Sequence, residues 1–153
     1  MMKNLFQEGV ADELSRRFLS IKDYQKPDWG KMNAGQMICH CSDTLREALG
    51  LRPTRSSSNF LTSTFVKWVT FYLISWPKGK LPTSHEYDQQ LGGTPSKEFE
   101  ADRNELLRLL KTMQEQPEWF NFHAHPLFGK LSRKEWGRLT FVHFDHHLRQ
   151  FGA

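Results

Sequence analysis

Three of the seven histidines lie close together near the end of the chain, at positions 143, 146 and 147. On a helix that turns about 100° per residue, His143 and His147 are one turn apart and share a narrow arc with Trp136 and Thr140. Two imidazoles at positions i and i+4 can bind the same metal ion, as they do in zinc-binding helices. His146 lies on the flank of this arc, which makes it a poorer ligand.

A third ligand has to come from another part of the chain, because catalytic zinc typically uses three protein ligands plus a water or a substrate. The candidate is His40, which lies near the edge of an apolar helix face, about one turn before Thr44. Packing of this helix against the last helix could bring the three rings together. A single histidine on an apolar face is more often a hydrogen-bonded core residue, so the spacing leaves both interpretations open.

Cys39 and Cys41 flank His40, and this arrangement resembles a short metal-chelating motif. Residues two apart point about 200° apart on a helix, so both thiols cannot chelate one ion while the helix is intact. We therefore expect Cys41 to be a small core residue and Cys39 to be a surface or interface thiol. His123 and His125 could also bind a metal ion together, but packing or hydrogen bonding to the backbone of their aromatic-rich loop is the favoured interpretation.

Polar residues one turn from these histidines are candidates for a general base or for orienting an imidazole ring. Asp43 and Glu47 follow His40 on the same flank of its helix, and both are weak candidates for a catalytic role. Charged side chains are more often solvated than buried, so simple exposure is the commoner outcome for both carboxylates. Gln36 and Gln150 also lie one turn from a candidate ligand, and each could hold its ring.

Other residues near the candidate site have simpler expectations. Asp145 lies at the back of the last helix, and we expect it to be exposed. Trp29, Trp76 and Trp119 could supply the walls of a small-molecule pocket, since such sites are mostly apolar. Ordinary core packing or loop anchoring is the more common role for any one of them.

Helical periodicity dominates the chain, and no segment shows sustained strand alternation between hairpin turns. Two helices have capping-box starts, with Asn33 followed by Gln36 and Ser132 followed by Glu135. The sequence predicts an all-α fold with helices over residues 11–21, 33–50, 60–76, 96–114 and 132–150. Four longer helices, with an extra helix in the long connection between the second and third, are typical of a bundle with a crossover.

Length and composition limit the class of protein. A chain of 153 residues fits one domain, residues 1–153, which can bury about 70% of its unfolded surface. A hydrophobic share of 38% and a charged share of 25% are typical of soluble globular proteins. The net charge of +4 is spread along the chain without a basic block or a reading motif, which argues against nucleic-acid binding.

The same features bear on where the protein works. Two cysteines cannot form the disulfide framework of a secreted domain, so we expect a reducing compartment, the cytoplasm. The first residues lack the apolar run of a signal peptide. Residues 60–76 contain Lys67 and several hydroxyl groups and are followed by Pro77, so they indicate a buried or half-buried helix of a soluble protein rather than a membrane span.

Several segments carry a resemblance to the DinB-like metalloproteins of bacteria. Residues 32–40 (MNAGQMICH) resemble the entry to that family's second helix, where a histidine is the first metal ligand. Residues 125–132 with Glu135 and Trp136 are similar to the loop before its last helix and to the start of that helix. His143, His146, His147 and Gln150 match its terminal H-x-x-H-H-x-x-Q pattern. Residues 76–80 (WPKGK) resemble one branch, and the similarity spans about residues 29–152.

The resemblance implies an up-down-down-up four-helix bundle with a divalent metal, Zn²⁺ or Ni²⁺, held by His40, His143 and His147. It also implies a metal-dependent enzyme, either a hydrolase or an S-transferase that uses a low-molecular-weight thiol, acting on a small molecule. The alternative is a non-catalytic bundle that binds the metal or a small ligand, and a nucleic-acid-binding module is the least favoured class. A homodimer is compatible with the many aromatic residues, although the sequence separates no interface stripe from the core.

Overall fold

The computed structural model describes residues 2–53, 55–72, 78 and 88–153. Its helices are α1 (Val10–Ser20), α2 (Ala34–Ala48), α3 (Lys67–Tyr72), α4 (Phe99–Gln114) and α5 (Arg133–Gln150), and a π-helical turn, η1 (Thr62–Val66), leads directly into α3. No strand forms among these residues, where the nearest approach is an isolated bridge between His125 and Gly129. The predicted all-α class is confirmed.

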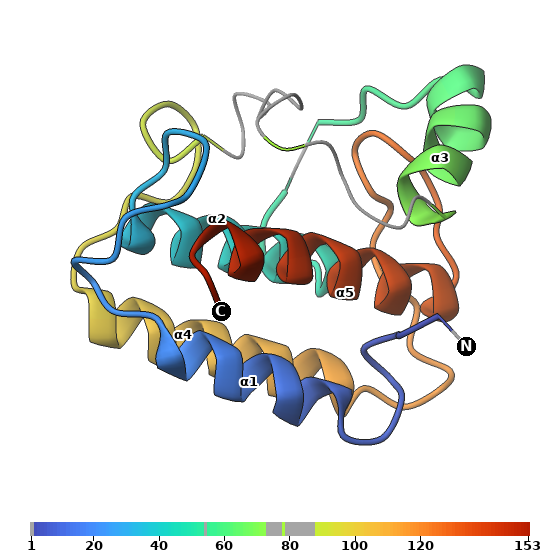
Figure 1. Cartoon of the computed structure of the whole chain (residues 1–153). Coiled ribbons are helices and arrows are strands. Elements are labelled where there is room, and N and C mark those ends of the chain that lie inside the picture. Colours follow the sequence, from blue (N-terminus) through green and yellow to red (C-terminus); the bar gives the residue numbers. More distant parts are fainter. Residues whose placement is uncertain (1, 54, 73–77, 79–87) are drawn as a thin grey trace.

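The four long helices lie side by side, as Figure 1 shows, with α1 and α4 in one layer and α2 and α5 in the other. Helix α2 packs against α4 and α5, and α1 packs against the same two helices. The apolar residues between them are fully buried, and the rings of Phe18 and Phe144 meet edge to face at 5.3 Å. The shared core therefore fixes α2 against α5, the two helices that carry the candidate ligands.

The starts of α2 and α5 were predicted correctly, because both capping boxes form. The Asn33 side chain accepts a hydrogen bond from the Gln36 backbone N–H at 2.8 Å, and the Gln36 side chain accepts one from the Asn33 N–H at 2.9 Å. Ser132 and Glu135 make the equivalent pair at α5. Gln36 is thus engaged at the N-terminus of α2, and the alternative that it holds the ring of His40 is not supported.

Helix α4 begins three residues later than the sequence predicts. The Glu98 side chain caps it by accepting hydrogen bonds from the backbone N–H groups of Glu100 and Ala101. Ser96, the expected start, instead donates its hydroxyl to the carboxylate of Asp102 at 2.9 Å, and the Lys97 N–H donates to the same oxygen. The Asp102 carboxylate therefore holds residues 96 and 97 in a turn outside the helix.

The helix predicted over residues 60–76 is present as far as Tyr72, and residues 73–76, including Trp76, lie outside the described part of the chain. Its inner face is anchored on the first half of α5, where the Lys67 ammonium group meets the Glu135 carboxylate at 2.8 Å. The expectation of a buried or half-buried helix is only half correct, since its outer face is exposed. No helix among the described residues is long and apolar enough to cross a bilayer.

Candidate metal centre

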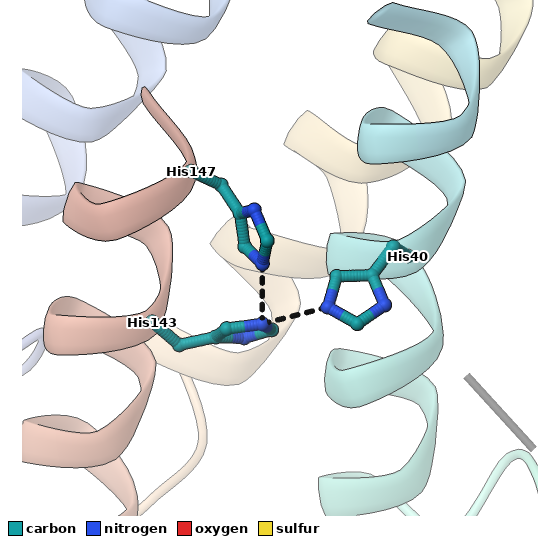
Figure 2. Close-up of side chains that lie close together, drawn as sticks. All are labelled: His40, His143 and His147. Atoms are coloured by element: carbon teal, nitrogen blue, oxygen red, sulfur yellow. Dashed lines mark hydrogen bonds between the residues drawn. The ribbon is translucent and has the colours of Figure 1, made fainter. Parts of the chain in front are cut away.

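Three histidines from two helices converge between α2 and α5. Figure 2 shows His40 pointing from α2 toward His143 and His147 on α5. The Nε2 atom of His143 lies 2.9 Å from Nε2 of His40 and 3.0 Å from Nε2 of His147. One potential ligand atom from each of the three residues lies within 4.8 Å of the other two. The structure thus brings together the three predicted ligands, as a cluster that could bind a metal ion.

The cluster is largely withdrawn from water. His40 and His147 are each 7% exposed, and His143 keeps somewhat more contact with solvent. Burial lowers the pKa of His40 to about 4 and holds the pKa values of His143 and His147 well below the ordinary range, with the neighbouring imidazoles adding to the effect on the α5 pair. All three rings are therefore neutral at pH 7, which is the form that binds metals.

Gln150 holds the ring of His147 from behind. Its side-chain N–H donates to the backbone carbonyl of Trp29 at 2.6 Å, which leaves its oxygen to accept a hydrogen bond from Nδ1 of His147 at 2.8 Å. The proton of His147 is thereby placed on Nδ1, and the lone pair of Nε2 points into the cluster. The prediction that Gln150 orients a ring agrees with this contact.

The connection between α1 and α2 supports Gln150. The backbone N–H of Asp28 donates to the carbonyl oxygen of Gln150 at 2.7 Å. Gly30 has φ +84°, and a Cβ atom there would lie 2.4 Å from the side-chain nitrogen of Gln150. Sequence reasoning missed Gly30 because no local signal shows that the connection between α1 and α2 faces α5.

The donor set fits a cation. A neutral imidazole has one proton, and in His147 Nδ1 carries it, so Nε2 of that ring can only accept. A proton on Nε2 of His143 could point at only one of its two close nitrogen neighbours, and without that proton its lone pair would face the lone pair of His147. A tetrahedral ion with bonds of about 2.0–2.1 Å separates its ligand nitrogens by about 3.3 Å, so small ring movements would accommodate one.

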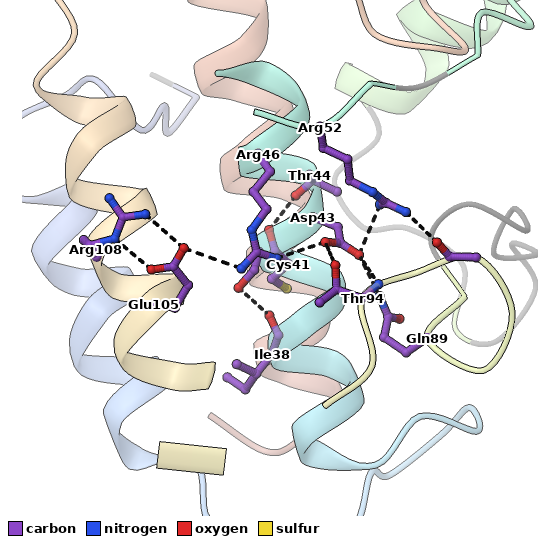
Figure 3. Close-up of polar contacts among 12 residues, drawn as sticks. Ile38, Cys41, Asp43, Thr44, Arg46, Arg52, Gln89, Thr94, Glu105 and Arg108 are labelled. Carbon is purple, nitrogen blue, oxygen red and sulfur yellow. Dashed lines mark hydrogen bonds and ion pairs between the residues drawn. The ribbon is translucent and has the colours of Figure 1, made fainter. Parts of the chain in front are cut away.

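Asp43 is buried rather than solvated, which corrects the commoner expectation. It is 0% exposed, and its carboxylate joins α2 to two other segments (Figure 3). It accepts hydrogen bonds from the Thr94 hydroxyl at 2.6 Å and from the Gln89 amide at 3.2 Å, and it forms ion pairs with Arg46 at 3.0 Å and Arg52 at 3.1 Å. These partners engage both oxygens, so the geometry supports a structural role.

Glu47 is also buried, at 1% exposed, where a solvated side chain was the commoner expectation. It lies one turn beyond Asp43 on the same helix, near the end of α2. Its weak candidacy for a catalytic role stays a prediction, since the three-histidine cluster does not include it.

Cys39 is buried as well, so the expectation of a surface thiol was wrong. It lies near Asp102 of α4, and burial together with that carboxylate raises the pKa of its thiol to about 12. Cys41 is a core residue as predicted, with its sulfur 3.9 Å from the sulfur of Met37. The cysteines do not join the histidine cluster, and raised pKa values make both poor nucleophiles.

The other histidines that the structure describes, at positions 123, 125 and 146, stay outside the cluster. His146 lies beside His147 on the flank of α5, with its ring 5.9 Å from that of Trp29. The ring of His125 stacks on Phe128 at 4.6 Å and accepts hydrogen bonds from two backbone N–H groups of its own loop. Packing and loop hydrogen bonding, the favoured interpretation for His125, is what the structure shows.

Three further expectations have different outcomes. Asp145 is not exposed: its side chain is 17% accessible and bridges Arg17 and Arg149 by ion pairs, tying α5 to α1. Trp119 is 80% exposed, so it forms no pocket wall. Trp29 does lie next to the cluster through His146, and the ammonium group of Lys78 lies over its ring, 4.4 Å from the centroid.

Comparison with known proteins places the chain in a family without assigning it a reaction. No curated protein matches it, and no solved structure matches it. Residues 6–153 match a family described as "Protein of unknown function (DUF1569)", and this match includes all three histidines of the cluster. The chain belongs to the DUF1569 family.

Proposed function

We propose that this protein is a metal-dependent enzyme whose divalent ion, Zn²⁺ or Ni²⁺, is bound by His40, His143 and His147. The observation that carries the proposal is the convergence of three neutral, largely buried imidazoles from α2 and α5 on one point. Within the described residues the cluster has three members and no fourth. Three protein ligands with a remaining position are typical of catalytic rather than structural zinc sites.

We further propose that the fold is a DinB-like four-helix bundle with up-down-down-up topology. The direction of the chain in Figure 1 supports this, since α1 and α5 run one way while α2 and α4 run the other. The long connection between α2 and α4 carries α3, as a crossover would. The position of the histidines on the second and last long helices agrees with the same assignment.

The residues around the centre have separate tasks. A divalent ion in this site would supply Lewis acidity, activating a bound water for hydrolysis or a small thiol for transfer to an electrophile. Gln150 fixes the Nδ1 proton of His147 and keeps its Nε2 lone pair directed inward. Burial keeps the rings neutral, and the partial exposure of His143 marks the side from which a small molecule would reach the centre.

A second candidate function is a non-catalytic bundle that binds the ion for stability or for sensing a small ligand. The contacts of Asp43 favour it to this extent: this carboxylate, three residues after His40, is engaged by Arg46, Arg52, Thr94 and Gln89 rather than directed at the cluster as a base. The two functions differ in whether the remaining coordination position exchanges small molecules.

Elemental analysis of the purified protein tests the centre directly. We expect close to one equivalent of a divalent transition metal in the wild type, and a loss of most of it in His143→Ala and His147→Ala with helix content unchanged. His123→Ala is the matched control, because that histidine packs near Gly50, outside the cluster. Unchanged stoichiometry in both cluster variants would contradict the metal assignment.

Activity is tested on the metal-loaded protein with simple esters and amides, and with small thiols plus an electrophile. Turnover that disappears on chelation and returns with the metal supports the enzyme. Stoichiometric metal without turnover, in a protein whose unfolding free energy depends on the metal, supports the non-catalytic alternative.

A further inference from the structure

The helix formed by residues 60–72 presents an apolar stripe to solvent, which we call the outer face. It comprises Leu61, Phe65, Trp68 and Tyr72, flanked by Phe60, and these side chains are 51% to 85% exposed. Their spacing of four, three and four residues places the four main members along one side of the helix. The rings of Trp68 and Tyr72 lie 5.8 Å apart on this side.

The outer face is held in place by contacts on the opposite side of the helix. Phe71 is buried, and its ring packs edge to face on Phe128 at 5.6 Å. The Arg138 guanidinium of α5 donates to the carbonyl oxygen of Phe71 at 3.0 Å, and the Lys67–Glu135 ion pair adds a second tie to α5. Because the inner side is already packed, the outer face cannot be buried by a simple rotation of the helix.

The exposed apolar area of the outer face is larger than the area that isolated apolar residues on a protein surface would expose. A large aromatic side chain has a surface of about 150–250 Å². The outer face and its flank contain four aromatic side chains and one leucine, each more than half exposed, so together they leave about 500–700 Å² accessible to solvent. The largest apolar patch on a typical monomer is about 300–600 Å². Two such faces in contact would remove about 1,000 Å² or more from water, which is the lower limit for a specific protein interface.

We propose that the outer face binds the outer face of a second copy of this chain, forming a two-fold symmetric dimer. The four-three-four spacing is the pattern with which one helix packs against another, and an isologous interface makes each copy the partner of the other. The area matches a small dimer interface. No charge opposes the pairing, because Lys67 is the one charged residue in 60–72 and its ammonium group meets Glu135.

The same charge argument disfavours a membrane as the partner. Helices that lie in the bilayer interface carry several lysines or arginines on their polar side, which attract anionic lipids. The polar side of residues 60–72 carries hydroxyl groups and the paired Lys67 instead. Two copies of one uncharged apolar stripe therefore fit each other better than a lipid surface.

Sedimentation equilibrium of the full-length protein between about 1 and 100 μM tests the proposal. We expect a concentration-dependent dimer in the wild type and a monomer throughout the range in Phe65→Glu/Trp68→Glu, which corresponds to a loss of at least about 100-fold in dimer affinity. Trp119→Glu is the matched control, since it places the same charge on another highly exposed tryptophan, and it should dimerise as the wild type does. Helix content and metal content check that each variant is folded.

Three results would overturn the proposal. They are a wild type that stays monomeric at 100 μM, a double variant that dimerises like the wild type, and a Trp119→Glu control that dissociates equally. A monomeric wild type that sediments with vesicles of neutral and anionic phospholipid, in a manner lost in the double variant, would assign the outer face to a membrane. If the double variant does not fold, exchange of the backbone amides in residues 60–72 of the wild type decides, since protection must fall on dilution.

Discussion

Replacing Gly30 with alanine tests whether the connection between α1 and α2 holds His147 in its metal-binding orientation. The new Cβ atom would lie 2.4 Å from the side-chain nitrogen of Gln150. That nitrogen is at the end of a flexible side chain, so it can move at little steric cost. Movement, however, breaks its hydrogen bond to the Trp29 carbonyl and draws the amide oxygen away from Nδ1 of His147.

The expected magnitudes separate backbone strain from loss of the ring contact. Alanine at positive φ costs about 1–2 kcal/mol, and the lost hydrogen bond adds about 1 kcal/mol, so Gly30→Ala should lower the unfolding free energy by about 2–3 kcal/mol. Residues that orient a metal-binding histidine typically contribute 10- to 100-fold to metal affinity. We therefore expect zinc affinity to fall by about 10- to 100-fold in Gly30→Ala.

Gly9→Ala is the matched control, because Gly9 has a similar φ of +76° and no atom within 4 Å of the new Cβ. It should lose about 1–2 kcal/mol through the same backbone strain and keep full zinc affinity. Unfolding in guanidinium with a chelator present measures stability, and competition with a chromophoric zinc chelator measures affinity. Gln150→Ala should weaken zinc binding similarly, and the double variant with Gly30→Ala should be little weaker than either.

Equal zinc affinities for Gly30→Ala and Gly9→Ala would refute the reasoning. Additive losses in the double variant would also refute it, since they would mean that Gly30 acts independently of Gln150. The tautomer of His147, read by nitrogen NMR of the metal-free protein, checks the same contact without metal. Gly30→Ala should shift that ring away from the Nδ1–H form, and Gly9→Ala should not.

Three further predictions follow from the surroundings of the centre. Asp43→Asn should lower the unfolding free energy by about 3 kcal/mol, because a buried carboxylate loses its charge between two arginines. Glu105→Gln, which removes the charge from a more exposed ion pair, should lower it by less than about 1 kcal/mol. Denaturant unfolding measures both changes. Burial lowers the pKa of His125 to about 4, so the unfolding free energy should fall as the pH drops from about 6.5 to 4. His125→Asn keeps an acceptor for the loop N–H groups, and it should remove about 2–3 kcal/mol of this pH-dependent loss of stability. Cys39 and Cys41 should react slowly with a thiol reagent at pH 8 in the folded protein, because burial raises their pKa values. Replacing both cysteines with alanine should leave the metal content unchanged in elemental analysis.

Local signals explain which helix boundaries were predictable. Asn33 and Ser132 start their helices as predicted because a capping box is written in four consecutive residues and needs no distant partner. The start of α4 was missed because Ser96 is a preferred cap by type, while the Asp102 carboxylate that removes it from the helix is selected only when the chain folds. Glu98, an uncommon cap, then takes that place.

The candidate site shows the same division between local and distant information. Helical periodicity alone puts His143 and His147 on one side of α5. The position of His40 on an apolar helix face made it a candidate, and the family resemblance favoured it, but its arrival at the other two rings depends on how α2 packs across the core. The burial of Asp43 was not predictable, because its partners include Arg52 and Thr94, from two separate segments outside α2. Nothing in the order of residues shows that these segments meet.

The position of the three imidazoles agrees better with a ligand-binding site than with ordinary core packing. Apolar side chains between α2 and α5 would bury surface without removing polar ring nitrogens from water, and that removal is unfavourable unless the nitrogens gain partners. Gln150 is itself 3% exposed and serves to fix one of these rings. A cation bound among the ring nitrogens would offset the unfavourable burial of these polar groups, which is the physical reason for the metal assignment proposed above.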